Sequence, residues 1–140
     1  MGIGIVIRDS TSDIQVVLAA QRSFVTSAFL AECYALLRAI NLCIDMGFEN
    51  VEFEGDAKAV VDAVNAMGSN FSCSGQIIED IRQVKLLHSR WKFSFIRRER
   101  NRASHHTAQL ALPLDIETVW MEEGLVVVLP YISCDKSCVL

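Results

Sequence analysis

The chain has 140 residues, of which 51% are apolar, so it has the length and composition for one domain with a sizeable core. No apolar run reaches the roughly 18 residues that a membrane span needs. The opening residues, Met1 followed by GIGIVIRD, lack the pattern of a signal peptide. We therefore expect no membrane partner, a single domain over residues 2–135 and a short tail at 136–140.

The net charge of −4 excludes a uniformly basic protein that coats nucleic acid, but the charges are unevenly distributed. Residues 82–102 contain eight of the 13 basic residues and one acid, so this segment carries +7 and the remainder −11. One interpretation is an acidic body with a basic edge that binds nucleic acid. The alternative is an ordinary solvated face.

The cysteines have neither an even count nor CxxC spacing, which argues against a disulfide framework and a zinc site. We interpret them as reduced thiols, typical of a cytoplasmic or nuclear protein. They are Cys33, Cys43, Cys73, Cys134 and Cys138.

The chain begins with a predicted antiparallel hairpin. Gly2–Asp9 and Ile14–Ala20 are rich in Ile and Val, and the turn-forming STSD lies between them. A helix follows over 28–46, with Thr26 or Ser27 as its N-cap and Gly47 as its stop.

The second half of the chain alternates helices with strands. The predicted elements are a strand at 50–55, a helix from Asp56 to about Met67, a loop at 68–74, a helix at 75–88, a strand at 91–97, a helix from Asn101 to Leu112, and a strand or packed tail within 119–132. This order predicts an α/β domain in which helices cover a mixed sheet.

Glu32 has an unusual place on the helix predicted at 28–46. At about 100° per residue, it projects opposite the polar stripe of Arg38, Asn41 and Asp45, and so toward the sheet. A carboxylate there is costly unless it is paired or binds a cation. The alternative is a glutamate at the edge of the face that bends out to water or pairs with an arginine.

Asp56 follows VEFEG, at the carboxyl end of a predicted strand, where open α/β sheets place ligands. The competing interpretation is a simple helix N-cap. Together with Glu32, however, Asp56 forms a pair of acids that can converge on a divalent metal ion.

Five segments, in order, resemble the ribonuclease H-like domain found in plant proteins of retroelement origin. They are GIGIVIRDS, FLAECYALLRAI, VEFEGDAKAVVDAV, FSFIRRERNRASHHTAQLA and the tail from Trp120. The resemblance implies a ribonuclease H-like mixed sheet. Active members of the family cut the RNA strand of RNA–DNA hybrids with four carboxylates and two Mg²⁺ ions. By this resemblance, Glu32 is the second acid and Asp56 the third.

The sequence departs from this family at two acids. The family's first acid lies on a central strand that precedes the segment matching GIGIVIRD, and that strand is missing here. Its loss leaves either a direct pairing of the strands at 2–9 and 50–55 or a gap, which residues 125–129 could fill. His105 stands at the fourth acid, and imidazole suits Mg²⁺ less well than carboxylate does. We therefore expect weak or absent binding of Mg²⁺ (or Mn²⁺) and little hydrolysis. Alternatively, His105 is an ordinary helix residue.

The candidate nucleic-acid-binding residues surround the turn before the last helix. Arginine forks and helix N-termini both favour phosphate, although a solubilising loop has the same composition. These residues are Arg97, Arg98, Arg100, Asn101 and Arg102. Trp91, Phe93 and Phe95 could stack on bases, but alternating aromatics on a strand are usually core.

Three functions stay open from the sequence. The first is a catalytically weak domain that binds an RNA–DNA hybrid or RNA. The second is an active Mg²⁺-dependent hybrid ribonuclease, if an upstream strand restores the first acid. The third is a domesticated scaffold or a decaying fragment without activity.

Overall fold

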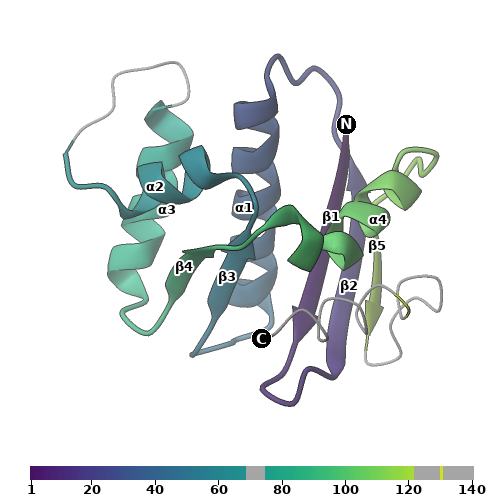
Figure 1. Ribbon diagram of the computed structural model, residues 1–140, viewed down its shortest axis with the longest axis horizontal. Helices are drawn as coiled ribbons and strands as arrows, with labels where there is room; N and C mark the ends of the chain where they lie inside the picture. The colour runs from purple at the N-terminus through teal and green to yellow at the C-terminus, as the bar shows by residue number, and fades with distance from the viewer. Residues whose placement is uncertain (69–74, 122–129, 131–140) are drawn as a thin grey trace. The chain divides into compact units, whose positions relative to one another are not determined.

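The computed structural model describes residues 1–68, 75–121 and 130, and its element order agrees with the prediction (Figure 1). It is a mixed α/β fold with antiparallel and parallel strands, consistent with a ribonuclease H-like fold. The chain divides into two compact units, which we describe separately. The first unit comprises Met1–Val25 and Arg97–Leu140, and the second comprises Thr26–Ile96.

The first unit is built on the predicted hairpin. Strands β1 (Gly2–Arg8) and β2 (Ile14–Gln21) pair antiparallel from Gly2–Gln21 to Arg8–Ile14. Strand β5 (Thr118–Met121) pairs antiparallel with the other side of β2, giving the order β1-β2-β5. A strand within 119–132 is thus confirmed for its first residues, whereas residues 125–129 lie outside the described part of the chain.

The STSD turn closes this hairpin through the side chain of Asp9. Its Oδ1 accepts hydrogen bonds from the backbone N–H of Thr11 at 2.9 Å, the Thr11 hydroxyl at 2.7 Å and the backbone N–H of Asp13 at 2.9 Å. These donors, the Thr11 hydroxyl first, lower the pKa of the Asp9 carboxyl. The turn that the sequence predicted is therefore stabilised by an aspartate side chain, as in an Asx-turn.

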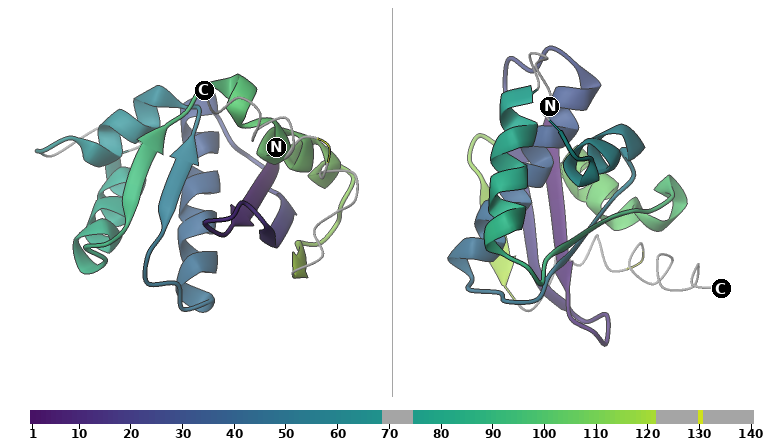
Figure 2. Two further views of the ribbon diagram at one scale, coloured as in Figure 1. Left: turned by 60° about the horizontal axis from the view of Figure 1, so that its bottom comes forward. Right: turned by 90° about the vertical axis from the view of Figure 1, so that its left-hand side faces the viewer.

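Helix α4 (Arg102–Ala111) packs directly on β1, as Figures 1 and 2 show. Two glycines of β1 permit this close approach. A Cβ added at Gly2 would lie 1.8 Å from the carbonyl oxygen of Ala108, and one at Gly4 would lie 2.2 Å from that of Ser104. The Gly-Ile-Gly pattern therefore serves helix–strand packing, with Ile3 and Ile5 in the core.

The second unit begins with α1 (Ala28–Asp45), which has the predicted caps. The Ser27 hydroxyl accepts a hydrogen bond from the Leu30 backbone N–H at 3.1 Å, and Gly47 has the left-handed φ of +71° that a helix stop requires. On this helix Leu42 is buried, whereas Ile44 is 44% exposed.

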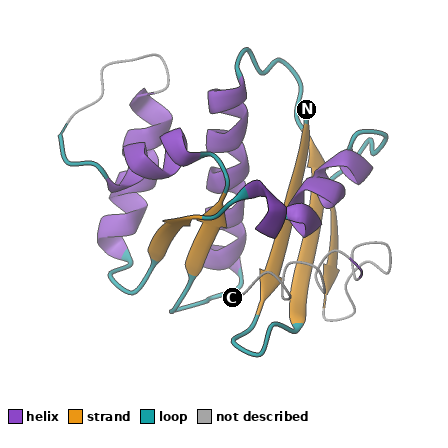
Figure 3. Ribbon diagram, viewed as in Figure 1, coloured by secondary structure: helices purple, strands orange, loops and turns teal. Residues whose placement is uncertain are grey.

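Strands β3 (Glu52–Gly55) and β4 (Lys92–Phe95) form a two-stranded parallel sheet, drawn in orange in Figure 3. The Phe53 and Phe93 rings stack with centroids 4.9 Å apart, and Trp91 meets Phe53 edge-on at 5.2 Å. Trp91 and Phe93 are therefore core residues and do not stack on bases. Phe95, expected on the same face, is 44% exposed at the end of the strand.

Within the described residues, hydrogen bonds join the strands of the first unit into one sheet and those of the second unit into another. None of the described helices combines the length and the apolar character that crossing a membrane requires.

Two further helices complete the second unit, and both differ from the expectation at their ends. Helix α2 (Lys58–Asn65) begins after Asp56, with Ala57 at the N-cap position and no side-chain capping bond. Helix α3 (Gly75–Leu87) buries Ile77, Ile78 and Ile81. Two leucines at its end, Leu86 and Leu87, are 76% and 82% exposed.

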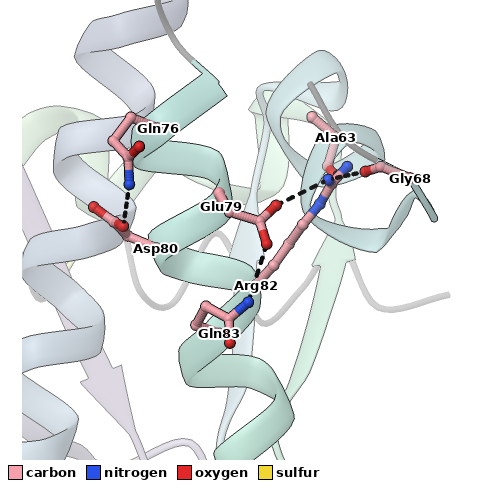
Figure 4. Close-up of polar contacts among 7 residues, drawn as sticks. All are labelled: Ala63, Gly68, Gln76, Glu79, Asp80, Arg82 and Gln83. Carbon is pink, nitrogen blue, oxygen red and sulfur yellow. Dashed lines mark hydrogen bonds and ion pairs between the residues drawn. The ribbon is translucent and has the colours of Figure 1, made fainter. Parts of the chain in front are cut away.

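Arg82 joins α3 to the end of α2 (Figure 4). Its guanidinium donates to the carbonyl oxygen of Ala63, from Nε at 3.0 Å and from Nη2 at 2.6 Å, and also to that of Gly68. Only 13% of the side chain is exposed. The guanidinium thus satisfies carbonyls at the C-terminal end of α2, where the helix dipole also favours a cation.

We predict that Gly4→Ala destabilises the protein by about 1–3 kcal/mol or more, because its Cβ would overlap the backbone of α4 and force the helix away from β1. Chemical denaturation measures this effect. Gly55→Ala is the matched control, since a Cβ there meets no atom within 4 Å. Equal stability of the two variants would contradict the packing role of Gly4.

We predict that Arg82→Ala lowers the free energy of unfolding by about 1.5–3 kcal/mol, because partly buried carbonyls lose a charged donor. The control is Arg90→Ala, which removes an exposed pair with Glu49 at 3.7 Å. That variant should change the stability by about 0–1 kcal/mol. Urea melts of both variants test the difference, and a similar loss in each would show that Arg82 acts only through its charge.

Candidate functional site

The candidate arginine cluster, Arg97–Arg102, lies in the first unit between β4 and α4. A short 3₁₀ turn (Arg98–Arg100) shapes it, with the Arg100 N–H bonded to the Arg97 carbonyl at 2.9 Å and the Asn101 N–H bonded to the Arg98 carbonyl at 3.0 Å. Asn101 occupies the predicted N-cap position of α4, but its side chain makes no capping bond.

The four guanidinium groups of the arginine cluster are accessible to different degrees. Arg97, Arg98 and Arg102 are exposed, whereas Arg100 is half-buried. Arg97, Arg98 and Arg100 precede a ten-residue helix and Arg102 is its first residue; the first backbone N–H groups and the dipole of this helix favour an anion. Guanidinium groups beside a helix N-terminus can donate pairs of hydrogen bonds to phosphate oxygens. Contacts of this kind do not distinguish one base from another.

Three other basic residues of segment 82–102 lie in the second unit and have partners there. Arg82 holds the end of α2, and the Lys85 ammonium donates to the Asn65 side chain at 2.7 Å. Arg90 pairs with Glu49. Sequence reasoning missed these structural roles, because the partners of Arg82 and Lys85 lie 14–20 residues away in the chain.

Glu32 is half-buried on α1, in the second unit. At about 100° per residue, the buried residues Leu42, Cys43, Ile40 and Cys33 lie on both sides of the direction in which Glu32 projects. Its charge also contributes to the raised pKa of the neighbouring Cys33 thiol. The side of the helix that carries Glu32 is therefore the packed side, as the sequence pattern indicated.

Asp56 is also half-buried and belongs to the same unit as Glu32. It follows the last residue of β3, Gly55, at the carboxyl end of a parallel strand. The N-cap position of α2 belongs to Ala57, so Asp56 does not occupy the place that the capping interpretation assigned to it. That the Glu32 and Asp56 carboxylates share a metal ion stays a prediction.

The donor set of Glu32 and Asp56 fits one hard divalent cation in chemical terms. Mg²⁺ is commonly held by one or two carboxylates together with water and substrate phosphates. Within the described residues, no group of three or more His, Cys, Asp or Glu side chains is arranged to hold a metal. His105 is half-buried on α4, in the first unit. The two carboxylates therefore suit an open site that depends on the ligand's phosphates.

Cys33 and Cys43 are free, buried thiols beneath this side of α1. Burial raises the pKa of each thiol to about 11, and the negative charge of Glu32 adds to the effect at Cys33. Both are therefore protonated and poorly nucleophilic at neutral pH. Cys73, Cys134 and Cys138 lie outside the described residues.

A family model described as reverse transcriptase-like matches residues 1–125 of the chain. The matched range includes Glu32, Asp56, the arginine cluster and β5. No curated protein matches the chain.

The buried thiols predict how the stability depends on alkaline pH. An unfolded thiol ionises near pH 9.0, whereas the folded Cys33 and Cys43 retain their protons up to about pH 11. Their contribution is fully present below pH 9 and is lost as the pH rises toward 11. We expect the free energy of unfolding to fall by about 1–3 kcal/mol over this range. Urea melts at a series of pH values measure the fall.

The Cys33→Ala/Cys43→Ala double variant is the control for that pH series. Its alkaline slope should be clearly shallower, because only tyrosines, lysines and the remaining thiols still titrate. An unchanged slope would show that the two buried thiols do not cause the loss of stability.

Proposed function

The chain belongs to the reverse transcriptase-like family, with its ribonuclease H-like fold, and we propose on this basis that it binds an RNA–DNA hybrid or RNA through the arginine cluster. The family relation supports a nucleic-acid-related role in general. The observation that carries the specific proposal is the exposure of Arg97, Arg98 and Arg102 beside the N-terminus of α4. Contacts of this kind position a phosphate backbone and are independent of base sequence.

The roles of the four arginines follow from their accessibility. Arg97, Arg98 and Arg102 would contact phosphates, because a bidentate guanidinium matches two phosphate oxygens. The half-buried Arg100 would act from within the turn, together with Asn101. Binding of this kind releases counterions, so it weakens steeply as salt is added.

We further propose that the acidic site is weak. Glu32 and Asp56 would hold a Mg²⁺ or Mn²⁺ ion that, when bound, activates water and neutralises phosphate charge. By the resemblance to the ribonuclease H-like family, Glu32 and Asp56 are only two of the four metal-binding acids, and His105 stands at the position of the fourth. Fewer carboxylates mean weaker attraction for the cation, so binding would depend on the substrate's own phosphates. Hydrolysis is then slow or absent.

The matching motifs and their order also support a plant, retroelement-derived origin, and the odd number of cysteines without CxxC spacing supports a place in the cytoplasm or nucleus. A scaffold without ligand and an active hybrid ribonuclease are the competing functions, and the two experiments below separate them.

We predict that the Arg98→Ala/Arg102→Ala double variant binds a 12-base-pair RNA–DNA hybrid more weakly and reduces the salt slope of log K by about 2, one for each lost phosphate contact. Fluorescence anisotropy over a series of salt concentrations measures both quantities. Lys58→Ala/Arg90→Ala is the control, because it removes the same charge from exposed sites elsewhere. Equal effects of the two double variants would show that the arginine cluster contributes to binding only through the net charge of the protein. No binding by the unchanged protein would favour the scaffold.

We predict little or no cleavage of the hybrid with either Mg²⁺ or Mn²⁺. A gel assay with a fluorescent RNA strand tests this, with Glu32→Gln as the matched variant that preserves size but removes the charge. Robust turnover that disappears in Glu32→Gln would refute the weak site and establish an active nuclease. Turnover that persists in the variant would indicate a contaminating enzyme.

A further inference from the structure

Glu99 is an acid in the middle of the arginine cluster. It is the one acidic residue of segment 82–102, and its side chain is exposed, as are those of Arg97 and Arg98. Among the described residues, no hydrogen bond or ion pair holds the Glu99 carboxylate or the guanidinium groups of Arg97 and Arg98. The carboxylate therefore neither closes the turn through its side chain nor neutralises a neighbouring arginine, and it is available to a ligand.

The 3₁₀ turn presents Arg98 and Glu99 side by side. A 3₁₀ helix has three residues per turn, so the side chains of three consecutive residues point about 120° apart. Arg100 is the half-buried residue of the three, so the other two side chains flank the outward direction. Two backbone hydrogen bonds close this turn, from the Arg100 N–H to the Arg97 carbonyl at 2.9 Å and from the Asn101 N–H to the Arg98 carbonyl at 3.0 Å. A phosphate held by Arg98 would thus have the Glu99 carboxylate beside it.

The chemistry of a carboxylate limits what Glu99 can contact on a nucleic-acid backbone. A carboxylate only accepts hydrogen bonds. Phosphate oxygens are acceptors as well, and their negative charge repels it. The ribose 2′-OH of RNA can donate a hydrogen bond, whereas deoxyribose has no such group. In a paired strand the base edges lie in the grooves, so the 2′-OH is the donor that a carboxylate beside a bound phosphate would meet.

We propose that Glu99 accepts a hydrogen bond from the ribose 2′-OH next to the phosphate that Arg98 binds, and that it thereby selects an RNA strand over a DNA strand. The inference rests on the proposed function and deepens it, because the arginines alone hold a phosphate backbone of either kind. On DNA the same carboxylate only repels phosphates. The selection therefore combines a favourable contact with RNA and an unfavourable charge against DNA.

Three 12-base-pair duplexes of one sequence test this selection by fluorescence anisotropy: an RNA–DNA hybrid, a DNA duplex, and a hybrid whose RNA strand carries fluorine in place of each 2′-OH. The 2′-fluoro strand keeps a ribose-like sugar but has no hydrogen-bond donor there. The unchanged protein should bind the normal hybrid about 2- to 10-fold more tightly than the 2′-fluoro hybrid, the range that one net hydrogen bond provides. It should also bind the DNA duplex more weakly than the normal hybrid.

The variants separate the hydrogen bond from the charge. Glu99→Ala removes the acceptor, whereas Glu99→Gln removes the charge but retains a carbonyl acceptor of the same reach. Both should fold as the parent does, because the side chain is exposed. Glu99→Ala should lose the preference for the normal over the 2′-fluoro hybrid, and Glu99→Gln should retain it. Asp115→Ala is the control, since it removes an exposed acid from the same unit and changes the net charge equally, and it should also retain the preference.

The outcomes distinguish this inference from the proposed function. If the unchanged protein binds the normal and 2′-fluoro hybrids equally, or if Glu99→Ala retains the preference, Glu99 does not contact the 2′-OH and the proposed function stands without it. If Asp115→Ala loses the preference as Glu99→Ala does, the selection follows net charge and the inference is wrong. If the unchanged protein binds none of the three duplexes, the proposed function fails together with it.

Discussion

The close approach of α4 to β1 is the constraint on which the candidate interface depends. Without side chains at Gly2 and Gly4, the helix backbone lies against the strand, close enough that a Cβ would meet the carbonyl oxygens of Ala108 and Ser104. This contact fixes the axis of α4 relative to the hairpin. The 3₁₀ turn with its arginines leads directly into that helix, so the same contact determines where the phosphate-binding groups lie within the first unit.

The basic residues of segment 82–102 look alike in the sequence, but tertiary contacts give them different roles. Arg82 and Lys85 satisfy a carbonyl and an amide oxygen around the end of α2, so they stabilise the fold. The arginines at 97, 98 and 102, around the start of α4 in the first unit, are exposed. A basic segment of 21 residues thus contains a structural part and a part suited to binding, and only the second supports a function.

For the two acids, Glu32 and Asp56, the cost of desolvating a carboxylate is weighed against its attraction for a cation. Glu32 shares the packed side of α1 with two buried thiols, and its charge helps to keep the Cys33 proton in place. A carboxylate retained on such a side costs desolvation energy, which a bound cation would offset. Asp56 follows the last residue of β3 and precedes Ala57, the N-cap residue of α2. Both observations are compatible with the metal site proposed from the family resemblance.

The sequence by itself determined the order and nature of the elements, because the hairpin turn, the Ser27 cap and the Gly47 stop are local interactions within a few residues. It also indicated the packed side of α1, since helical periodicity is a local property. Only the tertiary structure paired β5 with β2 and assigned Arg82 to the end of α2. These outcomes depend on contacts between residues distant in the chain, and no local pattern encodes which partner a buried group will find.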